Sequence, residues 1–301
     1  MKAEAVSIAA GQVRWGDLLE LAKPRITLMV LVTVAAGAFL AAPEAFSAGL
    51  LLETLLATGL LASAASALNQ VIESREDARM SRTRHRPVAA GRLDRGWVAA
   101  GAAASSVLAI AVLAWRANLL AAAIGGLTVV SYLFLYTPLK KRTAWATVVG
   151  AVPGALPPML GWAAAAGEIG TGAWVLFGIV FLWQLPHFMA IAWMYRDDYE
   201  RGGFAVLPIR DRNGLGTALA MVVPVLALVT LTTLAPSWGV GSIATAAGGL
   251  VAGLGFLGAC LMFWRRRQVG AARTVLLASI FYLPAVLAAV LVDHLPPGVL
   301  G

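Results

Sequence analysis

Two acidic clusters, each close to arginines, contain the residues of this sequence best suited to chemistry. The first contains Asn69, Glu73 and Asp77, within NQVIESREDARMSRTRHRP at 69–87. This i, i+4, i+8 spacing would place the three side chains on one face of a continued helix, over about 12 Å of its axis. Carboxylate and amide oxygens suit Mg²⁺, which usually takes substrate phosphates and water as its other ligands. The pattern therefore predicts a site for a metal-bound diphosphate.

The second cluster contains the adjacent residues Asp197 and Asp198, followed by Tyr199 and Glu200. Neighbouring residues on a helix point about 100° apart, so we expect only one of the two aspartates to face a shared ion. Two acidic clusters beside arginines would form a cradle for a metal diphosphate, because guanidinium groups bind phosphate oxygens in bidentate fashion. The competing interpretation is a solvated rim of charges at helix ends.

Basic residues and one histidine complete the candidate site. His187 lies about midway along an apolar run, and an ionisable group at membrane depth is a functional candidate by default. A hydrogen-bonded packing residue is the alternative for this histidine. The loop YTPLKKRT at 136–143 adds a basic triplet. The basic residues that could hold phosphate in this setting include Arg82, Arg86, Lys140, Lys141 and Arg142.

The composition predicts that membrane-spanning helices position these residues. Sixty per cent of the 301 residues are hydrophobic and 13% are charged, whereas a soluble domain carries about 25% charged residues. Lipid-exposed backbone must satisfy its hydrogen bonds internally, so long apolar runs predict helices. We expect one all-α, polytopic transmembrane domain over residues 1–301, with nine spans at 26–43, 49–72, 97–115, 118–136, 145–165, 172–194, 217–235, 239–263 and 275–292.

The charge distribution predicts the orientation. With the N-terminal segment 1–25 in the cytoplasm, 22 of the 23 Lys and Arg residues fall on the cytoplasmic side and only Arg116 falls outside. This bias follows the positive-inside rule, and nine spans place the C-terminus outside. Because the basic residues lie between apolar runs, the net charge of +8 indicates membrane topology and does not predict binding to nucleic acid. The first 25 residues include Glu4, Asp17 and Glu20 and lack the apolar region of a cleavable signal peptide. The acidic residues also argue against a mitochondrial presequence, which favours a bacterial inner membrane.

At these residues the chain resembles the intramembrane UbiA-type prenyltransferase superfamily and, within it, the protohaem IX farnesyltransferase family. The resemblance covers the central half of the chain in family order. It is carried by the stretch at 69–87, YTPLKKRT at 136–143, GAVPGALPPMLGW at 150–162, WQLPHFMAIAW at 183–193 and DDYERGGFAVLP at 197–208. The first stretch is similar to the whole superfamily, whereas WQLPHF with DDY is more specific to the haem branch.

The resemblance implies nine helices around a central cavity and an enzyme that transfers a farnesyl group from farnesyl diphosphate to a vinyl group of haem B, giving haem O. It implies Mg²⁺ as the cofactor, the lipid bilayer as surroundings, and proteins of the haem A pathway or terminal oxidase assembly as candidate partners. The resemblance assigns Asn69, Glu73 and Asp77 to the first metal motif and Asp197 and Asp198 to the second, with Asp198 as a metal ligand. It assigns His187 to haem binding. The residues implied for diphosphate binding are Arg82, Arg86, Lys140, Lys141 and Arg142.

Three alternatives stay open at the level of sequence. The first is a prenyltransferase of the same superfamily with an aromatic or quinone-precursor acceptor. The second is a membrane transporter, although the acidic motifs lie at one face and no inverted repeat is visible. The third is a haem-binding scaffold without catalysis. His85 is also an alternative to His187 as the residue that approaches haem iron.

Overall fold

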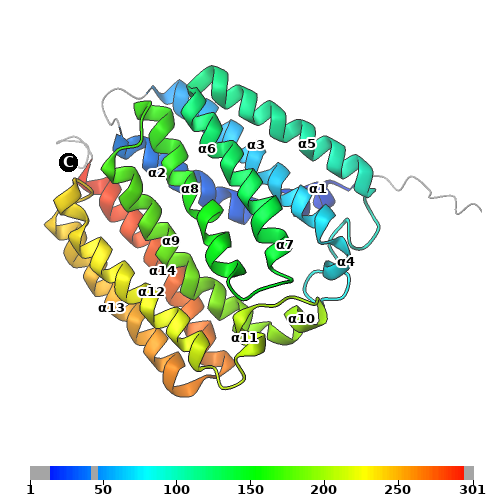
Figure 1. Ribbon diagram of the computed structural model, residues 1–301. Helices are drawn as coiled ribbons and strands as arrows, with labels where there is room; N and C mark the ends of the chain where they lie inside the picture. The colour runs from blue at the N-terminus through cyan, green and yellow to red at the C-terminus, as the bar shows by residue number, and fades with distance from the viewer. Residues whose placement is uncertain (1–13, 42–46, 295–301) are drawn as a thin grey trace, which may run out of the picture.

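Nine helical spans form the protein in the computed structural model, which describes residues 14–41 and 47–294 (Figure 1). No strand occurs among these residues, so the prediction of an all-α membrane fold is confirmed. The spans are α2 (Pro24–Ala41), α3 (Ala48–Ile72), α5 with π-helical η1 (Arg95–Val112, Leu113–Ala117), α6 with π-helical η2 and α7 (Leu119–Val130, Ser131–Tyr136, Thr137–Leu139), α8 (Ala146–Ala166), α9 (Thr171–Met194), α12 with η3 (Leu215–Leu234, Ala235–Trp238), α13 (Ile243–Arg266) and α14 (Val269–Asp293).

Two predicted boundaries are wrong by several residues, and local chemistry explains both. The eighth span begins at Ile243 instead of 239, because Gly239 and Gly241 adopt positive φ angles of 75° and 78° and form a turn before the Ser242 N-cap. The ninth begins at Val269 instead of 275, because the helix extends beyond its apolar run through Arg273. The predicted end of the first span, at 43, lies outside the described residues.

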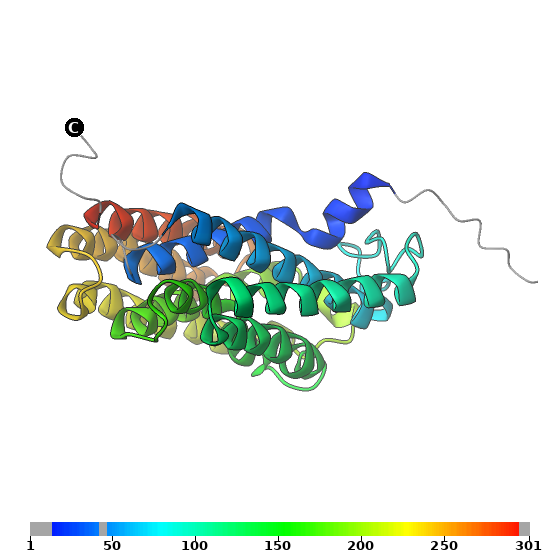
Figure 2. The same ribbon diagram turned by 90° about the horizontal axis from the view of Figure 1, so that it is seen from above.

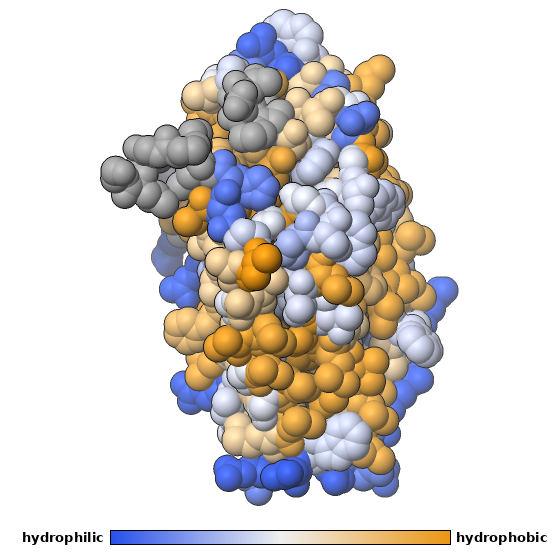
Figure 3. All heavy atoms as spheres, turned by 90° about the vertical axis from the view of Figure 1, so that its left-hand side faces the viewer, coloured by the Kyte–Doolittle hydropathy of each residue, from blue (hydrophilic) through white to orange (hydrophobic). Residues whose placement is uncertain are grey.

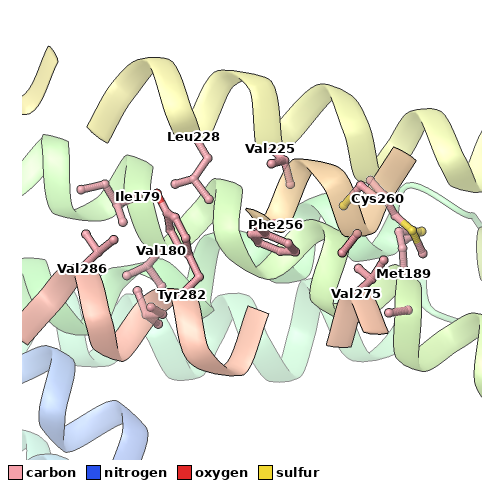
Figure 4. Packing of buried hydrophobic residues seen from close by; sticks show 14 of the residues in the cluster. Ile179, Val180, Met189, Val225, Leu228, Phe256, Cys260, Val275, Tyr282 and Val286 are labelled. Carbon is pink, nitrogen blue, oxygen red and sulfur yellow. The ribbon is translucent and has the colours of Figure 1, made fainter. Parts of the chain in front are cut away.

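The helices pack in two apolar clusters. Figures 1 and 2 place α12, α13 and α14 on one side of the bundle and α3, α5 and α6 on the other. Buried residues of α9, α12, α13 and α14 form the larger cluster, in which Phe256 and Tyr282 lie against Val225 and Leu228 (Figure 4). The second cluster joins α3, α5 and α6 to α2 and α8. Burial of large apolar side chains on several helices thus fixes their arrangement.

The backbones of α2 and α8 approach each other closely. A Cβ atom built on Gly37 would lie 1.9 Å from the main-chain oxygen of Pro158, and one built on Gly161 would lie 1.9 Å from that of Val34. Small residues permit this kind of close helix packing in membranes. The glycines therefore allow α8, which runs through Pro153, Pro157 and Pro158, to lie directly against α2.

The outer surface matches a membrane protein. Large apolar side chains such as Val251 and Phe281 are exposed along the spans. Figure 3 shows apolar residues over much of the lower half of one face and hydrophilic residues mainly toward its margins. Such extensive apolar exposure is unusual in soluble monomers. The chain is therefore a multi-pass membrane protein.

Short helices gather at one end of the bundle. They are α1 (Trp15–Ala22), α4 (Ser74–Asp77), α10 (Arg196–Arg201) and α11 (Leu207–Arg210). Figure 1 shows α4, α10 and α11 close to the end of the span that contains α7. These helices and the loops between them carry the acidic and basic motifs of the sequence.

Candidate active site

The first acidic motif is buried where α3 ends. Asn69, Glu73 and Asp77 are only 2%, 3% and 1% exposed, respectively. The prediction of one continued helix is wrong here: α3 ends at Ile72, Glu73 leaves the helical conformation at φ −93° and ψ 9°, and α4 begins at Ser74. The interruption is a single residue, and all three side chains are buried.

Each buried acid of this motif has a basic partner. Lys140 forms an ion pair with Glu73, and Arg86 donates to both Asp77 oxygens at 2.9 and 2.7 Å. Asn69 is held by a hydrogen bond of 3.2 Å from its Nδ2 to the hydroxyl of Thr137, in α7. Unpaired buried charges are costly, so this pairing explains how two carboxylates are kept in the interior. The stretch at 136–143 therefore supplies direct partners for the first motif.

Burial and ion pairing shift the pKa values of Asp77 and Lys140. Burial raises the pKa of Asp77, and the nearby Arg86 only partly opposes that effect. Burial alone would lower the pKa of Lys140, but the Glu73 carboxylate outweighs it and the pKa of Lys140 is raised. Lys140 is therefore held as a cation. Its Nζ also lies 4.7 Å from the centre of the Tyr136 ring, a cation–π contact.

The two aspartates of the second motif diverge. Asp198, in α10, is buried, whereas the Asp197 side chain is 83% exposed and lines an open surface pocket with Arg196 and Glu200. Burial would raise the pKa of Asp198, but hydrogen bonds from Arg201 and from the backbone N–H groups of Ser81 and Arg82 hold the pKa at about 2. Asp198 is thus an anion in this setting. The structure does not bring Asp197 to the same place.

Asp198 also joins the two motifs. Its oxygens accept from the N–H groups of Ser81 and Arg82 at 3.1 Å each. The Arg82 guanidinium lies 5.2 Å from the ring centre of Tyr195 and 5.6 Å from that of Tyr199. Both motifs therefore lie at the same end of the bundle, although more than 110 residues separate them in the chain.

The basic loop at 136–143 also contacts the loop that follows the second motif. The backbone N–H of Ala205 donates to the carbonyl of Lys140 at 2.7 Å, and Phe204 lies 5.4 Å from Lys140 Nζ. Lys141 reaches back to Glu76 at 2.5 Å. Arg142 differs from its neighbours: its side chain is exposed, and its carbonyl accepts from Arg210. Of the predicted basic set, Arg82, Arg86, Lys140 and Lys141 thus contact one or the other acidic motif or its loop.

Lys23 is a site residue that sequence reasoning missed. It lies between α1 and α2, with φ 46° in the left-handed region. Burial, followed by the charges of Arg86 and Lys140, lowers its pKa to about 7, and Glu73 and Asp77 partly oppose this effect. Lys23 therefore faces the same charged cluster as the first motif. Its position directly before Pro24, at the start of a span, is a weak signal without the fold.

Glu76 is a second missed residue. Its Oε1 atom pairs with Lys141, whereas its Oε2 atom is buried and accepts no hydrogen bond from the described residues. A buried acceptor without a partner is costly, which suggests a further donor or cation when the site is occupied. It lies inside the predicted motif, directly before Asp77 on α4, and pairs with Lys141 where Asp77 pairs with Arg86.

The donor set fits a magnesium ion that is shared with a diphosphate. The oxygens of Asn69, Glu73 and Asp77 are hard ligands, and Glu76 adds an acceptor without a partner. Among the described residues no three acidic, histidine or cysteine side chains gather closely enough to hold a metal alone. Mg²⁺ usually binds through one or two carboxylates and completes its shell with phosphate and water. The residues therefore suit a metal that arrives with its substrate.

His187 lies on α9, deeper in the bundle than the charged cluster. It lies seven residues before the end of α9 at Met194, about 10 Å of helix at 1.5 Å per residue. Its Nδ1 atom lies 2.8 Å from the hydroxyl of Ser279 in α14, and its ring lies 5.1 Å from that of Trp183. His85 is placed elsewhere, with its Nε2 atom 3.7 Å from Glu20 near α1.

Comparison with known proteins places this geometry in a family. The sequence pattern of the UbiA prenyltransferase family matches residues 30–289. A protein of Solibacter usitatus (strain Ellin6076) named protoheme IX farnesyltransferase is 42% identical over 287 residues, which cover 92% of this chain and 98% of that protein. The predicted family resemblance is therefore confirmed over almost the whole length.

Solved structures share the fold at low sequence identity. Digeranylgeranylglyceryl phosphate synthase has a TM-score of 0.77 at 15% identity, over 93% of this chain and 98% of that one. A UbiA homologue from Archaeoglobus fulgidus, solved with GPP and Mg²⁺ bound, has a TM-score of 0.58 at 14% identity, over 91% and 99%. These similarities concern the arrangement of the helices.

Proposed function

This chain belongs to the UbiA prenyltransferase family, and we propose that this prenyltransferase transfers a farnesyl group from farnesyl diphosphate to a vinyl group of haem B, giving haem O. The observation that carries the proposal is the cluster of buried carboxylates, each paired with a lysine or arginine, at one end of the bundle of nine spans found in residues 14–41 and 47–294. The relative from Solibacter usitatus, which this chain matches along almost all of its length, supports haem as the acceptor.

The paired charges provide both halves of a diphosphate site. Glu73 and Asp77 can pass from Lys140 and Arg86 to a metal ion, which frees the two cations for phosphate oxygens. Bound Mg²⁺ would add positive charge beside the diphosphate oxygens. Metal binding in the Archaeoglobus fulgidus homologue supports this part of the proposal. Asp198 as a direct metal ligand stays a prediction, since its oxygens hold the loop that bears Arg82.

The residues of this chain would neutralise the charge of the leaving diphosphate and keep water away from the cation. When the C1–O bond of farnesyl diphosphate breaks, both bonding electrons leave with the diphosphate, and Lys140, Arg86 and Lys23, which share one charged cluster with Glu73 and Asp77, would neutralise its charge. The vinyl carbon of haem then bonds to C1 of the allylic cation. The surrounding apolar helices exclude water until this bond has formed. Water finally adds to the resulting cation and loses a proton, which gives the hydroxyl group.

The membrane setting is part of the proposal. We place the charged end of the bundle in the cytoplasm of a bacterium. Residues 1–301 would form one domain in the inner membrane, and its helices would enclose a central cavity. The one-sided distribution of Lys and Arg supports this orientation. Contacts with oxidase assembly proteins stay a prediction from the family resemblance.

The experiment is a reconstitution in detergent or nanodiscs. Purified protein is incubated with haem B, farnesyl diphosphate and Mg²⁺, and the haem products are analysed by mass. We expect farnesylated haem, loss of product with a chelator, and recovery on adding Mg²⁺. 4-Hydroxybenzoate in place of haem tests the aromatic-acceptor alternative, and a prenylated benzoate without farnesylated haem would overturn the proposal.

A variant separates catalysis from haem binding. Asp77→Asn should lower turnover by about a hundredfold, because it removes a carboxylate from the metal and diphosphate site. Haem should still bind to this variant. Glu168→Gln, an exposed residue between α8 and α9, is the matched control and should keep wild-type turnover. Full turnover in Asp77→Asn would remove the first motif from the chemistry.

A further inference from the structure

One residue of α14 fixes the orientation of two aromatic side chains on α9. Ser279 is completely buried, and its hydroxyl lies 2.8 Å from Nδ1 of His187. Its main-chain oxygen accepts a hydrogen bond of 2.6 Å from Nε1 of Trp183. Trp183 and His187 belong to the stretch WQLPHF, whereas Ser279 lies more than 90 residues later and outside every motif of the sequence.

The hydrogen-bond partners of Ser279 favour one tautomer of His187. A serine hydroxyl has one hydrogen to donate, and Ser279 donates it to the carbonyl of Leu276 at 2.6 Å. The same oxygen must then accept from His187, so the Nδ1 atom bears the hydrogen. A neutral imidazole has only one N–H group, and the Nε2 atom therefore carries the lone pair.

Aromatic neighbours hold the imidazole ring in this orientation. The ring of Trp183 lies 5.1 Å from that of His187 at an interplanar angle of 30°. The ring of Phe188 lies 5.7 Å away at 74°. Ser279 holds His187 through its hydroxyl and Trp183 through its main-chain oxygen, so a change of the Ser279 side chain should alter the tautomer of His187 while the bond to Trp183 remains.

We propose that Ser279 is a positioning residue: it holds His187 in the Nδ1–H tautomer and thereby presents the Nε2 lone pair to the iron of the haem acceptor. The haem part of this inference rests on the proposed function. Histidines that bind metals usually donate their other ring N–H to a fixed acceptor, which sets the tautomer and the direction of the free nitrogen. Ser279 is such an acceptor for His187.

The tautomer is measurable without any haem. The chain contains three histidines, so protein labelled with ¹⁵N-histidine gives few signals, and His187→Gln identifies the signal of His187. Two-bond ¹H–¹⁵N correlations report which ring nitrogen is protonated. We expect Nδ1–H in the wild-type protein and a mixture of tautomers in Ser279→Ala. A wild-type protein with the proton on Nε2 alone would overturn the proposal.

Haem binding tests the consequence. In a titration followed by the Soret band, Ser279→Ala should bind haem B about tenfold more weakly than wild type, with altered histidine-ligation bands. Ser279→Thr retains a hydroxyl and should restore both the Nδ1–H tautomer and the affinity. An unchanged haem spectrum and affinity in a folded Ser279→Ala protein would overturn the positioning role.

A matched variant and the product assay separate the two proposals. Ser106 is also buried in a span, but its hydroxyl bonds only to Ala102 of its own helix among the described residues, so Ser106→Ala should leave the His187 signal and haem affinity unchanged. One outcome would separate the two proposals: wild type shows the Nδ1–H tautomer, Ser279→Ala binds haem more weakly, and wild type forms no farnesylated haem. The proposed farnesyl transfer would then be wrong, whereas the role of Ser279 would stand.

Discussion

Lys140 and Glu73 show how single residues serve both stability and chemistry in this site. Both are buried, and each neutralises the other. Lys140→Met would leave the Glu73 carboxylate without its partner, so we expect a loss of about 3–5 kcal/mol in the free energy of unfolding. Turnover should also fall, because the diphosphate loses a cation. Unfolding in mixed micelles and the haem product assay measure the two effects.

The double variant Glu73→Gln/Lys140→Met separates these effects. It removes both charges, so much of the lost stability should return, as when buried ion pairs are replaced by neutral residues. Activity should not return, because neither the carboxylate nor the ammonium is present. Recovery of turnover in the double variant would mean that the pair serves only the fold. No recovery of stability would mean that Glu73 and Lys140 do not depend on each other.

At the residue scale, sequence reasoning found most of the charged cluster and missed what depends on the fold. Asn69, Glu73, Asp77, Arg86 and Lys140 were predicted from spacing and resemblance, and their mutual contacts are consistent with one shared site. Lys23 was missed because nothing local marks it, and its neighbours come from other segments. The same holds for Ser279, which meets His187 only through the packing of α14 against α9.

At the scale of elements, sequence predicted the spans better than their ends. Apolar runs of spanning length placed all nine, since the bilayer sets the length. The start of α14 and the break of α3 at Glu73 depend on turn geometry and interfacial contacts, which hydropathy does not record. The crossing of α2 and α8 at Gly37 and Gly161 depends on which helices become neighbours, and spacing along the chain does not reveal that.

The α2–α8 crossing gives a prediction at this scale. Gly161→Ala would place a methyl group 1.9 Å from the main-chain oxygen of Val34, so the helices must separate. We expect destabilisation of about 1–3 kcal/mol, as is typical of overpacking. Gly255→Ala, in α13, is the matched control, because a Cβ there meets no atom within 4 Å and alanine favours the helix. Equal stabilities of the two variants in micelle unfolding would contradict the close approach.

At the scale of the whole molecule, the bundle of spans places the two candidate functional regions at different depths. The charged cluster lies at one end, where α4, α10 and α11 gather, and His187 lies about 10 Å from that end of α9. A polar diphosphate at the bundle end and an apolar prenyl chain among the helices would fit this order. The orientation of the bundle in the membrane then determines from which compartment farnesyl diphosphate enters its site.

The last prediction concerns that orientation. Arg84 follows α3 near the charged cluster, and Glu168 lies between α8 and α9 at the other end; both are exposed. In a Cys260→Ala background, Glu168→Cys should react with a membrane-impermeant maleimide on intact cells, whereas Arg84→Cys should react only after lysis. The reason is that the Arg84 side of the protein carries most of the basic residues, and loops rich in Lys and Arg usually lie in the cytoplasm. Since Cys260 is buried, the unaltered chain should label little and serves as the control. The reverse pattern would place the diphosphate site outside the cell, away from a cytoplasmic supply of farnesyl diphosphate, and would overturn the proposed topology while leaving the contacts of the site intact.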